Sequence, residues 1–196
     1  MQSSALHQLT SIVEWIALEK LFPKPLPLEI ELGSGDGSFL VEYAKLRLEK
    51  NFIGVERLLG RIRKMERKAQ RAGLTNLRGV RIESSYFIQY LVPPESVSAL
   101  HVYFPDPWPK RRHWERRLIN AAFPDSARRI LRAGGLVFLR TDNREYFQQM
   151  TEVFTASRDF RPAETPAELS AVRTDFEKDF RARGIETLRA AYQNKG

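Results

Sequence analysis

The stretch Leu28-Glu-Ile-Glu-Leu-Gly-Ser-Gly-Asp-Gly37 decides the fold, because it joins an apolar run to a loop that contains three glycines. The apolar run begins at about Leu26 and is interrupted only by Glu29 and Glu31. A helix is expected to follow over about residues 38–50. Strand, glycine loop and helix are the first half of a βαβ unit, so this stretch predicts an α/β domain.

The rest of the chain alternates between strand-like and helix-like patterns. We expect strands over residues 51–55, 77–82, 97–104 and 136–140, and helices over about 57–72, 112–131 and 143–156. A leading helix over about residues 5–22 is expected before them, and an extended segment near residues 185–192 after them. This alternation predicts one domain, over residues 1–196, with a mostly parallel sheet and helices on both faces.

Composition narrows the chemistry. With 42% hydrophobic and 29% charged residues, the chain has the balance of an ordinary globular domain. It has no cysteine and three scattered histidines, so we expect no disulfide, no cysteine nucleophile and no metal site. Glu14 and Glu19 interrupt the apolar N-terminal residues, so we expect no signal peptide, no membrane span and a cytoplasmic location. The net charge of +8 favours a polyanionic partner.

Acidic residues stand on or beside the ends of five predicted strands. They are Glu31, Glu56, Glu83, Asp106 and Asp142. In a parallel sheet, ligands bind beyond the carboxyl ends of the strands, which share one edge. A carboxylate near a sheet gains nothing from burial unless it finds partners, although any one of the five could cap a helix. The set therefore predicts a ligand site at this edge.

A second informative stretch is Phe104-Pro-Asp-Pro-Trp-Pro-Lys-Arg-Arg-His113. It holds Asp106 between two prolines and places Trp108 and three consecutive cations beside it. A nucleotide offers hydrogen-bond donors on a base edge, a face for stacking, and phosphates, so this combination suits a nucleotide. The alternative interpretation is a strand end followed by the solvated start of a basic helix.

The spacing of the glycine loop separates two cofactor classes. A dinucleotide-binding fingerprint requires Gly-x-Gly-x-x-Gly, but Ser38 stands where its third glycine belongs. The pattern Glu-x-Gly-x-Gly-x-Gly instead resembles the first motif of S-adenosylmethionine-dependent methyltransferases. By this resemblance the loop passes the methionine part of the cofactor, Glu56 accepts from the ribose hydroxyls, and Glu83 lies near adenine.

Taken with Ile53-Gly-Val-Glu56, Thr141-Asp142 and Thr174-Asp-Phe-Glu177, the two stretches resemble the bacterial tRNA (guanine-N7)-methyltransferases that modify the variable loop. The resemblance implies a Rossmann-like class I methyltransferase fold with a seven-stranded sheet, S-adenosyl-L-methionine as cofactor, and position 46 of tRNA as target. It implies Asp106 as the catalytic residue. The implied cofactor-binding residues are Glu31, Gly33, Gly35, Gly37, Glu56, Glu83 and Asp106. The implied substrate-binding residues are Lys110, Arg111, Arg112, Asp142, Thr174, Asp175, Phe176 and Glu177.

The helix expected over residues 57–72 carries two stripes. Its apolar residues should face the sheet; they are Leu58, Ile62, Met65, Ala69 and Ala72. One position earlier, a basic stripe lies about 100° round the helix; its members are Arg57, Arg61, Lys64, Lys68 and Arg71. The basic stripe is either a solvated flank or a track for RNA phosphates, with the segment Lys110–Arg117 sharing that load.

Guanine N7 has an in-plane lone pair and no proton, so its methylation needs no general base. Asp106 is therefore interpreted as a carboxylate that positions the guanine and stabilises its developing positive charge. Asp142 and Glu177 are candidates for reading the donors of the guanine edge, and Trp108 for stacking. Alternative functions are an amino-group (N6/N2) nucleic-acid methyltransferase, a noncatalytic RNA-binding subunit and, third, an NAD-dependent oxidoreductase. We expect a monomer or a homodimer.

Overall fold

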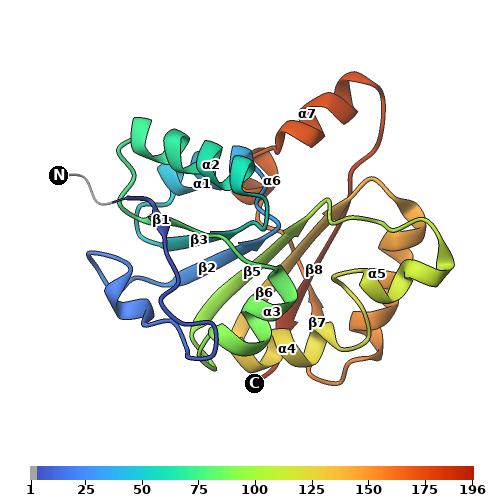
Figure 1. The fold of residues 1–196 in the computed structure, drawn as a ribbon. Helices are drawn as coiled ribbons and strands as arrows, with labels where there is room; N and C mark the ends of the chain where they lie inside the picture. Colours follow the sequence, from blue (N-terminus) through green and yellow to red (C-terminus); the bar gives the residue numbers. More distant parts are fainter. Residues whose placement is uncertain (1–3) are drawn as a thin grey trace.

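The computed structural model describes residues 4–196, except for the side chain of Arg111. Its centre is one sheet of eight strands in the order β1-β4-β3-β2-β5-β6-β8-β7 (Figure 1). The strands are β1 (Leu6–His7), β2 (Leu28–Leu32), β3 (Asn51–Val55), β4 (Leu77–Val80), β5 (Val97–Tyr103), β6 (Leu131–Thr141), β7 (Phe160–Ala163) and β8 (Leu188–Asn194). The prediction of a mostly parallel sheet is confirmed, with eight strands instead of seven.

Strand direction determines where the site lies. Strands β1 to β6 pair in parallel, whereas β8 is antiparallel to both of its neighbours, β6 and β7. The chain builds outward from β2 through β3 and β4, and then continues with β5 on the opposite side of β2. Ligands of open α/β sheets bind beyond the carboxyl ends of the strands where the order reverses in this way. At this edge lie the glycine loop after β2 and the chain after β5.

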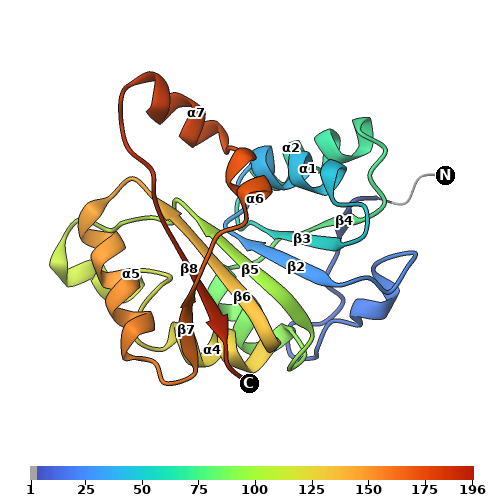
Figure 2. The ribbon, with the colours of Figure 1, turned by 180° about the vertical axis from the view of Figure 1, so that it is seen from behind.

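Helices cover both faces of the sheet, as Figures 1 and 2 show from opposite sides. One face is covered by α1 (Ser38–Leu46), α2 (Leu59–Arg71) and α6 (Ala167–Ala171). The other is covered by α3 (Ser84–Tyr86), the π-helix η2 (Phe87–Leu91), α4 (Phe123–Ile130) and α5 (Arg144–Ala156). The remaining helices are α7 (Asp175–Ala182), which projects beyond α6, and the short 3-10 helices η1 (Leu18–Lys20) and η3 (Arg111–Arg116).

Local patterns account for most of these elements. The strand predicted over residues 51–55 is confirmed without change, and α2 buries Ile62, Met65 and Ala69 as its apolar spacing predicts. Leu58, predicted to face the sheet with them, instead precedes the helix as its N-cap and is 45% exposed. Asn143 caps α5, because its side-chain oxygen accepts from the backbone N–H of Tyr146 at 2.8 Å. At these positions, Leu58 excepted, apolar periodicity and capping are sufficient to predict the element from the sequence.

The predicted leading helix over residues 5–22 is wrong. Residues 6–7 form the edge strand β1, which supplies the eighth strand, and Ala5 accepts a hydrogen bond from Gly79 N at 2.7 Å. The apolar residues of this segment serve both faces of the sheet: Ala5 packs with α1 and α2, whereas Ile16 and Leu21 pack on the opposite face. A helix with one apolar stripe reaches one face only, whereas an extended path across the edge lets the segment contribute to both faces.

The predicted helix over residues 112–131 is also corrected, because it is divided into η3 and α4. Arg117 has extended backbone dihedrals that end η3, and Pro124 lies in the first turn of α4, where its missing N–H costs nothing. β6 begins at Leu131, earlier than the predicted 136, and the tail adds β7, α6 and α7, which were not predicted.

Gly37 joins the glycine loop to α1 and lies against α2. Its φ is +75°, and a Cβ at this position would stand 2.3 Å from Met65 Cγ. Gly33 has a similar φ of +77°, but a Cβ there would meet no other atom within 4 Å. The two glycines therefore share a backbone requirement and differ in steric room.

We expect Gly37→Ala to lower the free energy of unfolding by more than Gly33→Ala. The left-handed backbone costs alanine about 1–2 kcal/mol at either position, whereas the overlap with Met65 adds roughly 1–3 kcal/mol at Gly37 alone. Urea denaturation of the two variants measures the difference. Equal losses would show that the contact with α2 is not the constraint.

Candidate active site

A cleft of about 490 Å³ opens at the carboxyl edge of the sheet. It is lined by the residues that follow four neighbouring parallel strands, namely Gly33 after β2, Glu56 after β3, Glu83 after β4 and Asp106 after β5. The structure thus brings these four sequence-predicted residues into one cavity, as the rule for strand ends requires. Glu31, Gly35 and Gly37 lie beside it on β2 and the glycine loop.

The glycine loop is held tightly to the end of β3. The backbone N–H groups of Gly33 and Ser34 both donate to Val55 O at 2.9 Å. Gly35 N donates to Glu56 Oε2 at 3.1 Å. Gly33 and Gly35 have positive φ angles, and at neither position would a Cβ meet an atom within 4 Å. The loop therefore turns sharply and leaves open space on its outer side, where a ligand can approach the backbone.

The carboxylates after β3 and β4 are fixed by backbone donors. Besides Gly35, Glu56 accepts from Leu58 N at 2.7 Å, and the residue is buried. Glu83 caps α3, with its two oxygens accepting from Ser85 N at 2.9 Å and Tyr86 N at 2.8 Å. Each oxygen keeps a second lone pair, so both carboxylates can accept from a ligand without losing these bonds.

Glu31 is a buried carboxylate that lacks a full set of partners. Its Oε2 has no hydrogen-bond partner among the described residues. Burial raises the pKa of the Glu31 carboxyl to about 8, while the Arg140 guanidinium opposes this shift. A buried oxygen without a donor is costly, and a ligand that brings a donor or a positive charge removes that cost. This suits S-adenosyl-L-methionine, which carries an ammonium group and a sulfonium.

The loop after β5 presents Asp106 at the mouth of the cleft. Asp106 is exposed, and none of the hydrogen bonds or ion pairs of the described part of the chain involves its carboxylate. Phe104 and Trp108, on either side, have φ angles of +52° and +42°, which non-glycine residues rarely adopt. A backbone of this kind persists only where surrounding contacts determine it.

Arg117 supplies those contacts. Its Nε donates to Pro107 O at 2.6 Å, and its other nitrogens donate to Gln149 at 2.5 Å and Glu145 at 2.7 Å. The side chain is 1% exposed, and its guanidinium lies over the rings of Trp114 and Tyr146. The prediction that Arg117 shares in phosphate binding is wrong, because its donors are used inside the protein.

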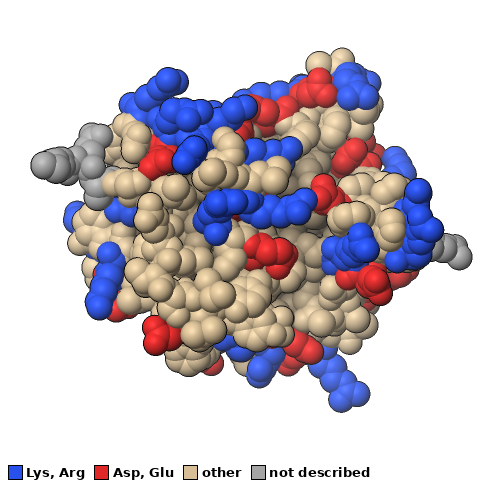
Figure 3. Space-filling view, viewed as in Figure 1, with Lys and Arg blue, Asp and Glu red and all other residues tan. Residues whose placement is uncertain are grey.

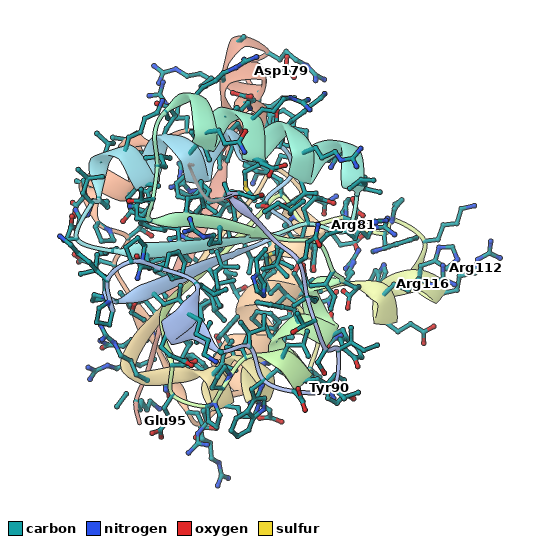
Figure 4. All side chains as sticks on the ribbon, turned by 60° about the vertical axis from the view of Figure 1, so that its left-hand side comes forward. Arg81, Tyr90, Glu95, Arg112, Arg116 and Asp179 are labelled. Atoms are coloured by element: carbon teal, nitrogen blue, oxygen red, sulfur yellow. The ribbon has the colours of Figure 1, made fainter. Side chains whose placement is uncertain are left out.

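The other cations of this segment face solvent. Lys110 and Arg112 are exposed, and Figure 4 shows Arg112 and Arg116 on the protruding lobe formed by η3. The Arg116 guanidinium lies 5.4 Å from the ring centre of Trp108, which lines the cleft. The side chain of Arg111 is outside the described residues. These positions fit an anionic ligand that is larger than the cleft.

Tyr103, at the end of β5, also lines the cleft, and sequence reading missed it. Its hydroxyl is hydrogen-bonded to His101 Nδ1 at 2.8 Å, and His101 Nε2 to Glu29 at 2.8 Å. Burial would raise the pKa of Glu29, but the hydrogen bonds from His101 and Lys50 lower it to about 2. An ionised Glu29 accepts from Nε2, so His101 links Glu29 to the Tyr103 hydroxyl through its two ring nitrogens. The sequence signal for this network is Glu29, an acid within an otherwise apolar strand, although its position predicts only an interruption of the apolar run.

The segment Thr174–Glu177 begins α7, and its residues divide into two kinds. Thr174 and Glu177 are buried and form a capping box, with Thr174 Oγ1 accepting from Glu177 N at 3.0 Å. Glu177 also pairs with Arg140 at 2.8 Å and Arg189 at 2.7 Å, so its carboxylate fixes the helix to β6 and β8.

Asp175 and Phe176 are exposed, and the Phe176 ring lies beside that of Phe104, tilted by 40° with ring centres 5.9 Å apart. Asp175 N lies 3.3 Å from Ser38 Oγ at the start of α1. α7 therefore stands beside both the glycine loop and the Asp106 loop. Asp142 is exposed immediately after β6.

The ionisable lining of the cleft balances three carboxylates with three guanidinium groups. The carboxylates are those of Glu56, Glu83 and Asp106, and the guanidinium groups those of Arg57, Arg61 and Arg116. Within residues 4–196, no group of three or more His, Asp and Glu side chains is placed to hold a metal ion. No helix over the same range is long and apolar enough to cross a membrane.

The strand order, the glycine loop after β2 and the acids after β3 and β4 define a class I methyltransferase. A family model described as "Putative methyltransferase" matches residues 25–190. Among solved structures, the 16S rRNA methyltransferase KamB superimposes with a TM-score of 0.69 at 15% identity, covering 93% of this chain and 95% of that one. A 30S ribosomal A1408 methyltransferase from an uncultured bacterium gives 0.60 at 16%, covering 89% of both chains. These likenesses establish the fold.

Sequence relatives identify the family. The chain is 36% identical to the tRNA (guanine-N(7)-)-methyltransferase of Aeromonas hydrophila subsp. hydrophila over 165 residues, which is 81% of this chain and 70% of that protein. It is 36% identical to the enzyme of the same name from Psychromonas ingrahamii over 146 residues, or 74% of this chain and 60% of that one. The chain belongs to the tRNA (guanine-N7)-methyltransferase family and spans about 60–70% of the length of these relatives.

We expect the raised pKa of Glu31 to make stability depend on pH. Between the ordinary pKa of 4.5 and the folded value of about 8, the folded protein holds a proton that the unfolded chain has lost. The free energy of unfolding therefore falls with rising pH in this window, by up to about 1.4 kcal/mol per unit from this group. Glu31→Gln should remove that slope, so that the variant gains on the wild type between pH 5 and pH 8. Urea denaturation across this range measures it, and a constant difference would contradict the assignment.

Proposed function

We propose that this chain transfers the methyl group of S-adenosyl-L-methionine to N7 of a guanine in the variable loop of tRNA, at position 46. The observation that carries the proposal is the single cleft in which the glycine loop, Glu56, Glu83 and Asp106 meet. Membership of the tRNA (guanine-N7)-methyltransferase family supports the choice of nucleophile and substrate. Bacterial tRNA is used in the cytoplasm, so the proposal places the enzyme there, as a monomer or a homodimer.

The inner part of the cleft suits the cofactor. In the proposal, the backbone at Gly33, Gly35 and Gly37 passes close to the methionine part, and the unpaired oxygen of Glu31 faces its positive charge. Glu56 accepts from the ribose hydroxyls, and Glu83 accepts near adenine. Both acids are already held by backbone donors, so little conformational freedom is lost when the cofactor binds. The bound cofactor supplies an electrophilic methyl group.

Asp106 acts on the substrate side. Guanine N7 attacks through a lone pair and has no proton to lose, so the protein needs no general base for this step. As the N7–methyl bond forms and the sulfur–methyl bond breaks, positive charge moves to the purine. A carboxylate fixed at the mouth of the cleft stabilises that charge and accepts from donors of the base. The rigid loop around Asp106 keeps it in position before the substrate arrives.

The tRNA itself contacts a wider surface in this proposal. Lys110, Arg111 and Arg112 bind phosphates near the reacting guanine, and Trp108 provides a face on which a base can stack. Asp142 reads a donor of the guanine edge. In the segment from Thr174 to Glu177, we assign direct contacts to Asp175 and Phe176, while Thr174 and Glu177 act by holding α7 in place.

We expect Asp106→Ala to lower kcat for tRNA methylation by at least about 100-fold, because a preorganised charge next to the transition state is lost. Cofactor affinity should change by less than about tenfold, since Glu31, Glu56 and Glu83 remain. Labelled methyl transfer to unmodified tRNA and equilibrium binding of the cofactor measure the two effects. Asp125→Ala, which removes an exposed aspartate on α4 outside the cleft, is the matched control.

The wild-type product tests the proposed function itself. N7-methylguanosine makes the RNA chain cleavable by aniline after reduction, whereas an N2 or N6 methyl group does not. Cleavage at the variable loop is the expected outcome. Transfer to an exocyclic amine would indicate an amino-group methyltransferase, and binding of tRNA without transfer would indicate a noncatalytic subunit.

A further inference from the structure

The surface of α2 carries an unusual excess of positive charge. Residues 57–71 contain seven Lys and Arg residues and one acid, Glu66. Figure 3 shows Lys and Arg side chains gathered over α2 at the upper left of this face, with further groups toward the cleft and the η3 lobe. The apolar side of the helix is fully used, because Ile62, Met65 and Ala69 are at most 1% exposed. The charge is therefore presented to solvent on a helix that is fixed to the sheet.

Most of these cations are unpaired. In the described part of the chain, only Lys68 among them forms an ion pair, with Asp36 at 2.8 Å. Some exposed cations in or next to other helices have acidic partners, as in the pairs Lys178–Asp175 and Arg183–Asp179, whereas Arg112, Arg116 and Arg181 form no ion pair among the described residues. Like charges along one helix repel each other, so their accumulation with few partners favours a polyanionic ligand.

The basic stripe faces the site. Its members Arg57 and Arg61 line the cleft, and Lys68 reaches Asp36 in the glycine loop. At 100° per residue, Lys64 and Arg71 lie on this same flank, over a length of roughly 20 Å. Arg63 and Arg67 are also exposed and form no ion pair among the described residues, but they lie about 40–100° round the helix from Lys64 and Arg71. Lys64 and Arg71 on the stripe and Arg63 and Arg67 off it are thus two pairs of equal charge at different orientations.

We propose that the basic stripe of α2 is a phosphate-binding track that carries the tRNA backbone from the mouth of the cleft along the helix to Arg71. The track rests on the proposed function for its ligand. RNA is favoured over a membrane surface because an interfacial helix inserts an apolar face, and the apolar face of α2 is already buried. Continuity with the cleft through Arg57 and Arg61 directs the bound strand toward Asp106.

The test compares two double variants of equal charge, Lys64→Gln/Arg71→Gln on the track and Arg63→Gln/Arg67→Gln off it. None of these residues lines the cleft. Binding of an unmodified tRNA transcript is measured without cofactor at several salt concentrations, together with the thermal midpoint of each variant. The track variant should lose at least about tenfold in affinity at 0.1 M salt, and its log–log salt slope should fall by about 1.5–2. The control should lose less than half as much in both.

Equal losses in the two variants would overturn the track and indicate a diffuse effect of net charge. An unchanged affinity of the track variant for tRNA would also overturn it. Binding to anionic phosphatidylglycerol vesicles is measured in parallel. If the track variant lost only this binding, the stripe would be assigned to a membrane surface and the track overturned. The binding assay separates this inference from the proposed function. If the wild-type protein binds tRNA through the track but transfers no methyl group, the proposed activity alone is refuted. If methylation is normal and the track variant keeps its affinity, the track alone is refuted.

Discussion

The burial of one guanidinium, that of Arg117, is the constraint on which the candidate site depends. Asp106 lies on a loop with two unfavourable backbone conformations, at Phe104 and Trp108, and such a loop relaxes unless something outside it determines its path. Arg117 does so by donating to Pro107 O while pairing with Glu145 and Gln149 of α5. A buried charge without these partners would cost several kcal/mol, so the loop and α5 are required to keep their relative positions.

A second buried arginine applies the same principle to the opposite wall. Arg140, 1% exposed at the end of β6, donates to the carbonyls of Leu169 and Val172 and pairs with Glu177. These contacts tie α6 and the start of α7 to the sheet, and Phe176 is carried into contact range of Phe104. The Asp106 loop and the start of α7 differ in sequence but are positioned by the same kind of interaction. In each case a buried guanidinium donates to several backbone and side-chain acceptors at once.

The difference between these arginines and the surface cations explains what the sequence could and could not predict. Strand, glycine loop and helix around Leu28–Gly37 follow from local spacing, and the acids after β3, β4 and β5 follow from the rule that parallel strands end at a common edge. Burial of Arg117 depends on acceptors about 30 residues away on α5, and nothing in the basic run that contains it separates it from Arg112 or Arg116. The leading helix failed for a related reason, because Ala5 and Ile16 pack on opposite faces of a sheet that local periodicity does not reveal.

The carboxylates of the cleft differ in a way that matches two ligands of different size. Glu56 and Glu83 are held by backbone N–H groups, and Glu31 is enclosed, which suits a small ligand that leaves water behind when it binds. Asp106 is exposed, and the cations that surround the mouth and continue along α2 are largely unpaired. A polyanion approaching from solvent is attracted by those cations before it meets Asp106, whose negative charge would otherwise repel it. In the proposed function, a carboxylate that stabilises a purinium ion can stand at the entrance, because the arginines beside it weaken its repulsion of phosphates.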